Sequence, residues 1–480
     1  MGKRQYDIVI IGAGAGGLIA AGFAAKIGAK VALVEKDRIG GDCTWTGCVP
    51  SKALLKAAKI AHHVRTASQY GIMSQAPVTD MTKVHEYIDA AIQHIYEPTA
   101  PEALRQKGMD VYLGPARFSD KESIIVGDHT LRSKHFLITT GARPYLPPIA
   151  GLDSVPYRTY ERIFDNKRLP RSMIVVGGGP VGAEISQAYQ RLGCQVTVIS
   201  KSLLPKEDAD VRQLLHEVFE LEGVRFVWGR ATSAHKDGET IVVSTGGEEA
   251  RGELLLIASG RRPNLEGLDL EKVGVQYSDK GITIDHRLRT TAKNIYAAGD
   301  VVGGYQFSHF AGWQAFQAIR NALLPGNSSG FTDIVPRITF TDPEVAHVGL
   351  SEEQARSRFG QEITVSRWDL SRVDRAVCDN ERRGFIKVIA KSDGTILAVT
   401  MIAERAGETI NEVAVAMKHG LKINDVAGTI HAYPTYSTGL QLLLTEMSLG
   451  RFLSGTSGKI IRSLWSRWNC EKGVTNNGQS

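Results

Sequence analysis

Two segments of the chain share one pattern of hydrophobic and polar positions. Each begins with a short run of apolar residues, passes through closely spaced glycines, continues as a helix-forming stretch and ends in a second apolar run. The first segment covers residues 6–36 and the second covers residues 171–201. This order predicts a strand, a tight turn, a helix and a strand, which is the βαβ unit of a dinucleotide-binding domain. A parallel sheet needs helical crossovers on its faces, so we expect the first two-thirds of the chain to be α/β.

The rest of the chain divides at two turn-rich stretches. Residues 143–156 are rich in proline and indicate a linker, and residues 324–330 mark a second break. Between the two βαβ segments we expect helices near residues 53–64 and 84–96. Beyond the second break we expect a third, α+β part, with strands at residues 337–342, 384–390 and 396–403 and a helix at 407–420. The polar end, residues 474–480, is expected to be disordered.

Length and composition narrow the class of protein. With 480 residues the chain is long enough for two to four domains, and its net charge of +6 is spread along the sequence. Such a mild charge gives little support for nucleic-acid binding, so we expect no nucleic-acid partner. Five cysteines are too few for a secreted disulfide scaffold, so we expect a cytoplasmic protein. The uncharged run at residues 8–25 looks like a signal peptide or membrane span, but GAGAGG directly after β-branched residues argues against both.

The glycines of the first βαβ segment have the spacing of a dinucleotide-binding turn. They are Gly12, Gly14 and Gly17. One allows the chain to turn, one lets the backbone approach a pyrophosphate, and one lets the helix pack on the strand. Glu35 ends the following strand, where a carboxylate accepts hydrogen bonds from ribose hydroxyls and repels a 2′-phosphate. With the pyrophosphate at the helix N-terminus, this site is predicted to bind FAD or NAD.

The second segment repeats the turn but changes the residue at the strand end. Its glycines are Gly177, Gly179 and Gly182. The position equivalent to Glu35 holds Ser200, followed by Lys201 and, slightly further on, Lys206. A small hydroxyl with nearby lysines suits the 2′-phosphate of NADPH, so we predict NADPH rather than NADH. The alternative is that both lysines are ordinary solvated side chains.

The sequence GGDCTWTGCVPSK, at residues 40–52, places Cys43 close to Cys48. Structural zinc usually needs a second cysteine pair or a Cys/His set, so we predict no metal site. A purely structural disulfide is also disfavoured, because it would close only a trivial loop. Residues five apart in a regular helix diverge, so the pair is expected in an irregular turn that Gly47 permits. Pro50 suits the first turn of the next helix, and Cys48 would lie near its N-terminus, where a thiolate is stabilised. Together with two dinucleotide sites, the pair predicts an electron relay.

Several further motifs make a resemblance specific. Besides the cysteine motif they are TTGARP at residues 139–144, ASGRRPN at 258–264, IYAAGD at 295–300 and FTDPEVAHVGLSEEQA at 340–355. Over about residues 5–450 the chain resembles the class I pyridine nucleotide-disulfide oxidoreductases, the family of glutathione reductase, dihydrolipoamide dehydrogenase and mercuric reductase.

The resemblance implies a glutathione reductase-like α/β fold, with two Rossmann-like dinucleotide-binding domains and a C-terminal α+β dimerisation domain. The FAD-binding domain would comprise residues 1–150 and 271–325, and the NAD(P)H-binding domain residues 151–270. Residues 335–455 would form the dimerisation domain, followed by a basic amphipathic tail at 456–480. A homodimer is implied, because members of this family build each active site from two subunits.

The resemblance also implies roles for individual residues. Cys48 would be the charge-transfer thiolate beside the flavin, and Cys43 the interchange thiol that faces the substrate. Lys52 would lie near the flavin N5 and pair with Glu184, although both would also suit surface helix charges. Asp300 would bind the ribityl chain of FAD. Further cofactor contacts would come from matching motif positions, which are Gly141, Gly260 and Phe307 in the QFSH turn.

One family motif is altered in this chain. Disulfide-reducing members carry His-Pro-Thr-x-x-Glu near the C-terminus, and its histidine moves protons to and from the thiols. Here the histidine position holds Tyr433 and the glutamate position holds Thr438. Tyrosine is a poor base at neutral pH. His431, which an extended chain would place on the same side as Tyr433, is either a substitute or a hydrogen-bonded interface histidine.

The leading hypothesis is a homodimeric enzyme of mercuric reductase-like character, because that branch also lacks the His–Glu pair and carries a tyrosine close by. It would use NADPH and FAD to pass electrons through the cysteine pair to a thiophilic acceptor such as Hg(II). The chain differs from typical mercuric reductases in having no N-terminal CxxC domain and no vicinal cysteines at its end, only Cys470. One alternative is a small-disulfide reductase of the glutathione or dihydrolipoamide type, and another is a redox-sensing flavoprotein.

The tail carries a separate pattern. Ile461, Leu464, Trp465 and Trp468 fall on one helical stripe among basic residues. This pattern indicates either a weak membrane-surface contact or, the interpretation we favour, a terminal helix that packs on the dimer.

Overall fold

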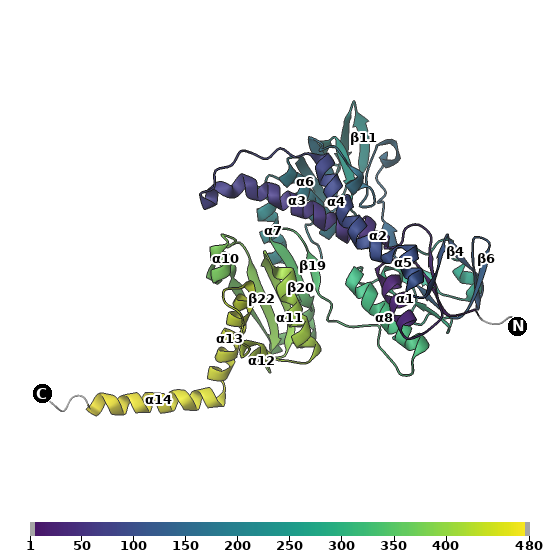
Figure 1. Cartoon of the computed structure of the whole chain (residues 1–480). Helices are drawn as coiled ribbons and strands as arrows, with labels where there is room; N and C mark the ends of the chain where they lie inside the picture. The colour runs from purple at the N-terminus through teal and green to yellow at the C-terminus, as the bar shows by residue number, and fades with distance from the viewer. Residues whose placement is uncertain (1–4, 476–480) are drawn as a thin grey trace. The chain divides into compact units, whose positions relative to one another are not determined.

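The computed structural model describes residues 5–475, which form two compact units (Figure 1). Unit 1 comprises the chain up to residue 206 together with residues 215–332. Unit 2 comprises residues 207–214 and the chain from residue 333 onward. The polar end that we expected to be disordered lies, from residue 476, outside the described residues.

The first sheet of unit 1 is built on the N-terminal βαβ segment. Strand β1 (Tyr6–Ile11) lies between β2 (Val31–Glu35) and β6 (His129–Ile138) and runs parallel to both. The strand order is β3-β2-β1-β6-β5-β4, and β18 also pairs with β6. These further strands are β3 (Met109–Leu113), β4 (Ala116–Asp120), β5 (Ser123–Val126) and β18 (Ile295–Ala297). Central parallel strands are buried on both faces, which explains the nearly uninterrupted apolar run of β1.

A second parallel sheet in unit 1 has the order β10-β9-β8-β14. Its strands are β8 (Ser172–Val176), β9 (Gln195–Ser200), β10 (Arg225–Trp228) and β14 (Leu254–Ile257). A three-stranded antiparallel sheet shares a hydrophobic core with it and consists of β11 (Ser233–Asp237), β12 (Thr240–Ser244) and β13 (Glu249–Gly252). The short strands β7 (Ala142–Pro144) and β15 (Arg261–Pro263) pair with each other, so the connections into and out of this part run side by side.

Helices complete unit 1. α1 (Ala15–Lys26) and α8 (Ser308–Leu323) pack against each other, and α6 (Pro180–Leu192) crosses from β8 to β9. The predicted helix at residues 53–64 is longer at its start, because α3 (Cys48–Thr66) already begins at Cys48. The other helices and short strands are α2 (Gly41–Trp45), α4 (Met81–Tyr96), α5 (Pro101–Gln106), β16 (Tyr277–Ser278) and β17 (Gly281–Ile282). α7 (Ala209–Leu221) begins among the residues of unit 2.

Unit 2 is an antiparallel sheet covered by helices. The strand order is β19-β20-β23-β22-β21. Its strands are β19 (Arg337–Thr339), β20 (Glu344–Gly349), β21 (Ile363–Asp369), β22 (Phe385–Lys391) and β23 (Ile396–Ala403). Its helices are α9 (Glu352–Phe359), α10 (Asp374–Cys378), α11 (Ala406–Lys418), α12 (Ile423–Ala427), α13 (Tyr436–Ser454) and α14 (Thr456–Thr475).

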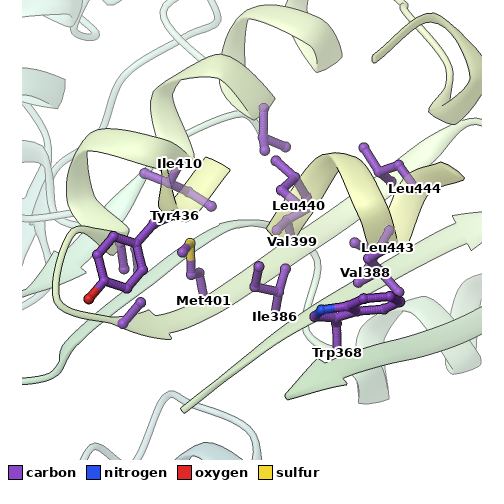
Figure 2. Packing of buried hydrophobic residues seen from close by; sticks show 14 of the residues in the cluster. Trp368, Ile386, Val388, Val399, Met401, Ile410, Tyr436, Leu440, Leu443 and Leu444 are labelled. Atoms are coloured by element: carbon purple, nitrogen blue, oxygen red, sulfur yellow. The ribbon is translucent and has the colours of Figure 1, made fainter. Parts of the chain in front are cut away.

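The core of unit 2 lies between this sheet and two helices. Figure 2 shows Ile386 and Met401 of the sheet facing Leu440 and Tyr436 of α13, with Ile410 of α11 alongside. The apolar residues of α13 recur at helical spacing, which places them on the buried side. In residues 5–475, no helix combines the length and the apolar character needed to cross a membrane.

Candidate active site

The glycine turn between β1 and α1 is shaped for close backbone approach. Gly12 has a φ of +102°, and a Cβ there would lie 2.4 Å from Thr139 O. A Cβ at Gly17 would lie 1.8 Å from Gly12 O. Gly14 caps α1, and a Cβ there would meet no atom nearer than 3.9 Å. Gly12 and Gly17 therefore allow the turn and the helix packing, while Gly14 leaves room at the helix N-terminus.

Glu35 ends β2 with its carboxylate fixed by the same turn. Its Oε2 accepts a hydrogen bond from Ala13 N at 2.7 Å, and its Oε1 accepts one from Asp37 N at 2.9 Å. Each carboxylate oxygen keeps a further lone pair that can accept from a ribose hydroxyl. The open N-terminus of α1 and this carboxylate together fit the pyrophosphate and ribose of a dinucleotide such as FAD.

The turn between β8 and α6 repeats this geometry. Gly177 has a φ of +122°, and a Cβ there would lie 2.3 Å from Ala258 O. A Cβ at Gly182 would lie 1.9 Å from Gly177 O. Gly179 caps α6 and would accommodate a Cβ with nothing within 4 Å. The second turn therefore also fits a pyrophosphate at a helix N-terminus.

At the end of β9 a hydroxyl takes the place of the carboxylate of the first site. Ser200 Oγ donates a hydrogen bond to Ser202 O at 2.9 Å. A Cβ at Gly178 would lie 2.8 Å from Ser200 Oγ, so the hydroxyl is held against the glycine turn. Lys201 and Lys206 are both exposed. This strand end thus offers a hydroxyl and two ammonium groups, a set suited to an added phosphate.

Cys43 and Cys48 flank a break between two helices. Cys43 lies in α2, and Cys48 is the first residue of α3, with Gly47 as the N-cap. A Cβ at position 47 would lie 2.8 Å from Asp42 O, so the turn needs glycine there. Both cysteines are free thiols, and a side-chain hydrogen bond joins them. The irregular turn expected from the sequence is present, and it brings the two sulfurs together.

The two thiols are electrostatically unequal. The hydrogen bond to Cys48, together with burial, raises the pKa of Cys43. The hydrogen bond from Cys43, the Ser308 hydroxyl and the charge of Lys52 lower the pKa of Cys48 to about 6, against the effect of burial. The N-terminus of α3 favours the same charge, because the helix dipole stabilises a thiolate there. Both shifts favour negative charge on Cys48 and a proton on Cys43.

Lys52 of α3 forms an ion pair with Glu184 of α6. The Nζ–Oε2 distance is 2.8 Å, and the side chain of Glu184 is only 8% exposed. A carboxylate this buried is not a solvated surface charge, so the interpretation of the two residues as surface helix charges is wrong for Glu184. The ion pair fixes α3 against α6 next to the turn that holds Cys43 and Cys48.

A network of charged side chains that the sequence did not reveal lies beside Cys43. Arg261 forms ion pairs with Asp42 and with Asp300, the latter at 3.0 Å between Nη1 and Oδ2. Tyr160 donates a hydrogen bond to Asp42 at 3.1 Å. Burial raises the pKa of Asp300. Arg261 thereby links Asp300, which we predicted to bind FAD, to Asp42, the residue next to Cys43. The only sequence signal for this network was the ASGRRPN motif, which contains Arg261.

The remaining predicted cofactor residues lie in open turns or at the start of α8. Gly141 and Gly260 have φ values of +68° and +120°, and a Cβ at either would meet nothing within 4 Å. Phe307 is the N-cap of α8 and stacks on His309 at a ring-centroid distance of 5.3 Å. The next residue, Ser308, was not singled out from the sequence. Its hydroxyl lies 3.3 Å from Cys48 Sγ.

In unit 2, Tyr433 and His431 have different partners. Tyr433 is 70% exposed and donates a hydrogen bond to Asp374 Oδ2 at 2.7 Å, which raises its pKa. The side chain of His431 is 7% exposed and lies 3.6 Å from Glu412 Oε2. Packing against α11, which carries Glu412, turns His431 inward.

Within the described part of the chain, no group of three histidine, cysteine, aspartate or glutamate residues is arranged to hold a metal ion. Cys194 is buried, whereas Cys378 is exposed. The side chains of Trp468 and Cys470, which we considered for the tail, lie outside what the structure describes.

The fold and the site define an oxidoreductase with two dinucleotide-binding turns and a redox-active cysteine pair. Comparison with known families gives the same class. The family model for pyridine nucleotide-disulphide oxidoreductases matches residues 6–315, and the model for the dimerisation domain of these enzymes matches residues 335–443. The chain belongs to this family.

Individual relatives differ in their reactions. The mercuric reductase of Lysinibacillus sphaericus is 33% identical over 449 residues, which are 92% of this chain and 82% of that protein. The dihydrolipoyl dehydrogenase of Thermus scotoductus is 34% identical over 455 residues, which are 91% and 96% of the two chains. The structure of RclA, an HOCl-induced flavoprotein disulfide reductase from Escherichia coli, matches with a TM-score of 0.83 at 28% identity, covering 92% of this chain and 99% of that one. RclA has also been solved as a Cu(II) complex.

These matches bear on four predictions from the sequence. The fold is glutathione reductase-like, with two nucleotide-binding domains and a dimerisation domain, and the protein is an oxidoreductase. Membership of the family implies FAD and a nicotinamide nucleotide as cofactors. The match to the dimerisation domain supports a homodimer.

Proposed function

We propose that the protein is an NADPH-dependent FAD enzyme that passes electrons through Cys43 and Cys48 to a thiophilic acceptor, Hg(II) or a related soft metal ion. The observation that carries this proposal is the side chain at the altered histidine position. Tyr433 is an exposed phenol whose pKa is raised by its hydrogen bond to Asp374. A group that stays protonated at neutral pH does not take protons from thiols, so it favours an acceptor that needs no proton shuttle.

Charged residues around the cysteine pair stabilise the thiolate that the proposed electron relay uses. FAD held at the first glycine turn would supply the electron pair, drawn from the hydride of the nicotinamide, that opens the Cys43–Cys48 disulfide. Opening of the disulfide by two electrons leaves Cys48 as a thiolate and, after uptake of one proton, Cys43 as a thiol. Lys52 keeps positive charge near Cys48, and the ion pair with Glu184 fixes its position.

A soft metal ion matches two cysteine sulfurs chemically, because thiolates are the preferred ligands of soft cations. Binding of Hg(II) to both sulfurs releases the proton of Cys43. If the two sulfurs give up an electron pair, both S–Hg bonds break, the Cys43–Cys48 disulfide re-forms and Hg(0) leaves. The overall reaction then turns NADPH and Hg(II) into NADP⁺, H⁺ and Hg(0). The mercuric reductases among the relatives and the Cu(II) complex of RclA support a metal-ion acceptor.

We assign FAD to the first glycine turn, within residues 1–150 and 271–325, and NADPH to the second, within residues 151–270. Ser200 and the two exposed lysines that follow β9 support NADPH rather than NADH, because they offer a hydroxyl and positive charge where the first site has Glu35. A carboxylate at this point would repel the 2′-phosphate.

Reduction of a small disulfide is the second candidate. It is favoured by the dihydrolipoyl dehydrogenases among the relatives and by the pairing of His431 with Glu412, a histidine and a carboxylate as in the family motif. The histidine side chain is only 7% exposed, and burial raises the pKa of Glu412. A base turned into its own domain is poorly placed to serve a substrate, so this candidate ranks below the metal ion.

A parallel assay of the purified holoenzyme tests the proposal. NADPH oxidation is followed with Hg(II), glutathione disulfide and lipoamide as acceptors, in the presence of an exogenous thiol that keeps Hg(II) soluble. We expect turnover with Hg(II) and little with either disulfide. Fast turnover with a disulfide and none with Hg(II) would refute the metal-ion acceptor. Failure of all three, with normal reduction of the flavin by NADPH, would instead identify a redox sensor.

We also propose a cytoplasmic location in keeping with the few cysteines. For the tail, a weak contact with a membrane surface is the alternative to the packing on the dimer that we favour. On α14, Ile460, Ile461, Leu464 and Trp465 are 48–66% exposed beside the basic Lys459 and Arg462. Co-sedimentation with anionic liposomes, with and without the residues after Gly455, tests the contact. No loss on truncation refutes it, and a weakened dimer would show that the helix packs on the partner subunit instead.

A further inference from the structure

A row of polar side chains crosses the sheet of unit 2. Arg337 of β19 lies opposite His347 of β20, His347 lies opposite Thr400 of β23, and Thr400 lies opposite Lys387 of β22. Directly opposite residues of antiparallel strands place their side chains on the same face, so these four share one face of the sheet. Side chains alternate along a strand, so the row faces away from the core that Ile386 forms with α13.

An acidic stretch, EDAD, follows the end of β9 after a short loop and lies on this row. The stretch belongs to unit 2, whereas the chain directly before it belongs to unit 1. Glu207 accepts hydrogen bonds from Arg337 with both carboxylate oxygens, at 2.8 and 3.2 Å. Lys387 Nζ lies 2.8 Å from Asp208 Oδ2 and 2.9 Å from each carboxylate oxygen of Asp210. Each of the three carboxylates is therefore paired with a cation of the row.

The positive charge of the row lies at its two ends. The side chain of Lys387 is only 3% exposed, and a buried ammonium group needs a bound anion. Burial lowers the pKa of Lys387, but the pairing with Asp208 and Asp210 outweighs this effect and raises the pKa above its ordinary value. Burial lowers the pKa of His347 to about 4, so the middle of the row is uncharged at neutral pH. The carboxylates lie at the two charged ends, beside Arg337 and Lys387.

The acidic stretch comes directly after a lysine that we assign to the 2′-phosphate. On the other side of Lys206 the loop is fixed, because Leu204 is 1% exposed and its N–H donates to Gly178 O at 2.7 Å. Glu207 and Asp208 are one and two residues from Lys206, and each residue adds about 3.8 Å of chain. They therefore lie within about one Debye length, roughly 8 Å in physiological salt. Unpaired carboxylates at this distance would repel a phosphate and attract the lysine.

We propose that Arg337 and Lys387 are positioning residues for nucleotide preference, because they bind the acidic stretch on the sheet of unit 2 and keep its three carboxylates away from the 2′-phosphate of NADPH. The inference rests on the proposed binding of NADPH at the second glycine turn, and it does not depend on the electron acceptor. It gives the dimerisation domain, to which both residues belong, a part in selecting the cofactor. NADH has no 2′-phosphate, so its binding should depend little on the row.

The test compares two nucleotides that differ only in the 2′-phosphate. The dissociation constants of NADP⁺ and NAD⁺ are measured by titration calorimetry on the oxidised holoenzyme, which neither nucleotide reduces. Lys387→Met is compared with a triple variant that adds Asp208→Asn and Asp210→Asn and so removes the carboxylates together with the lysine. Arg367→Met is the matched control, since Arg367 lies opposite Lys387 in the same row but pairs with Asp369 at 2.9 Å. Retention of FAD and an unchanged elution volume in size-exclusion chromatography check that each variant is folded.

We expect Lys387→Met to lower the preference for NADP⁺ over NAD⁺ by roughly 10-fold, mainly through weaker binding of NADP⁺, because two carboxylates lose their cation. The triple variant should return the preference close to the native value, and Arg367→Met should keep it. An unchanged preference in Lys387→Met would overturn the inference. Equal weakening of both nucleotides, or a triple variant no better than Lys387→Met, would overturn it as well.

Failure of the proposed cofactor gives a different result. A native protein that binds NAD⁺ at least as tightly as NADP⁺ would refute the assignment of NADPH, and this inference with it. A native preference for NADP⁺ that survives in Lys387→Met would refute the inference alone. If Lys387→Met does not retain FAD, Arg337→Met makes the same comparison, because it removes the cation from Glu207 only, and an unchanged preference there would overturn the inference.

Discussion

Tyr433 donates its phenolic hydrogen to Asp374 Oδ2 at 2.7 Å, in the position that holds the proton-shuttling histidine of disulfide-reducing family members. The two residues come from different elements of unit 2, because Asp374 opens α10 and Tyr433 precedes α13. The hydrogen bond to Asp374 raises the pKa of Tyr433 further above the usual value for tyrosine. A residue that is a base in other members is here a fixed hydrogen-bond donor, and this exchange changes the expected pH dependence.

The first prediction concerns that pH dependence. We expect kcat/KM for Hg(II) to rise as pH increases through about 6, where Cys48 becomes a thiolate, and then to stay level. Below this pH the sulfur is protonated and unreactive, so activity falls on the acid side. Tyr433→His should leave this profile unchanged, because an acceptor that needs no proton shuttle gains nothing from a base at this position. The native profile of kcat/KM against pH could instead show an inflection between neutral pH and the pKa range of tyrosine. If Tyr433→Phe removes that inflection, Tyr433 itself titrates.

For the ion pair between Lys52 and Glu184, we predict opposite shifts in the pKa of Cys48 when one or the other charge is removed. Lys52→Met removes a charge that favours the Cys48 thiolate and should raise the pH midpoint of Cys48 alkylation by iodoacetamide in the reduced holoenzyme, whereas Glu184→Gln removes an opposing charge and should lower it. Each shift should be roughly half to one pH unit, because the two charges partly screen each other. Shifts in the same direction for both variants would mean that the pair acts by holding α3 against α6 and not through its charge.

The βαβ units could be predicted from the sequence because their signals are local. A Cβ at Gly17 would meet Gly12 O, so the spacing of these two glycines is itself the signal for the turn, although Gly12 also lies against Thr139, directly after β6. The edge strand β21 was missed because Ser366 and Arg367 interrupt the alternation of apolar and polar residues, and the single buried residue in the strand is Trp368. Its pairing with β22 depends on a tertiary neighbour that no short pattern reveals.

The cysteine pair could also be predicted, because its motif is a short stretch of sequence. The residues that surround the pair in space could not. Ser308 lies 260 positions from Cys48 in the sequence, and Arg261 lies 219 from Asp42. Such contacts depend on how α8 and β15 pack, which neither residue type nor spacing encodes. His431 shows the converse, because its place in the sequence suggested a catalytic role, whereas packing against α11 turned the side chain away from solvent.

Two substitutions on α13 test how much the core of unit 2 contributes to the free energy of unfolding. Leu440→Ala removes a side chain that is 1% exposed between α13 and the sheet, and should cost about 2–5 kcal/mol of unfolding free energy. Leu442→Ala, on the same helix but 41% exposed, is the matched control and should change stability by less than about 0.5 kcal/mol within the subunit. Thermal unfolding with size-exclusion chromatography distinguishes the effects. A large loss in Leu442→Ala accompanied by dissociation would place this residue in the dimer interface.

Nucleotide preference should follow the residue at the end of β9. Glu35 shows what a carboxylate does at such a strand end: backbone N–H groups hold both oxygens, and each keeps a lone pair for a ribose hydroxyl. Ser200→Glu places the same group at the second site, where it would accept from the ribose of NADH and repel the 2′-phosphate of NADPH. The ratio of kcat/KM for NADPH over NADH should therefore fall by roughly 100-fold, since a like-charge contact costs several kcal/mol.

Anaerobic reduction of the flavin by each nucleotide measures this ratio without any acceptor, so the outcome does not depend on Hg(II). Lys201→Ala should lower the ratio in the same direction but less, because one of the two nearby lysines remains. Lys236→Ala, an exposed lysine on β11, is the control and should leave the ratio unchanged. If Ser200→Glu and Lys201→Ala both leave the ratio at its native value, the strand end does not read the 2′-phosphate, and the assignment of NADPH fails with it.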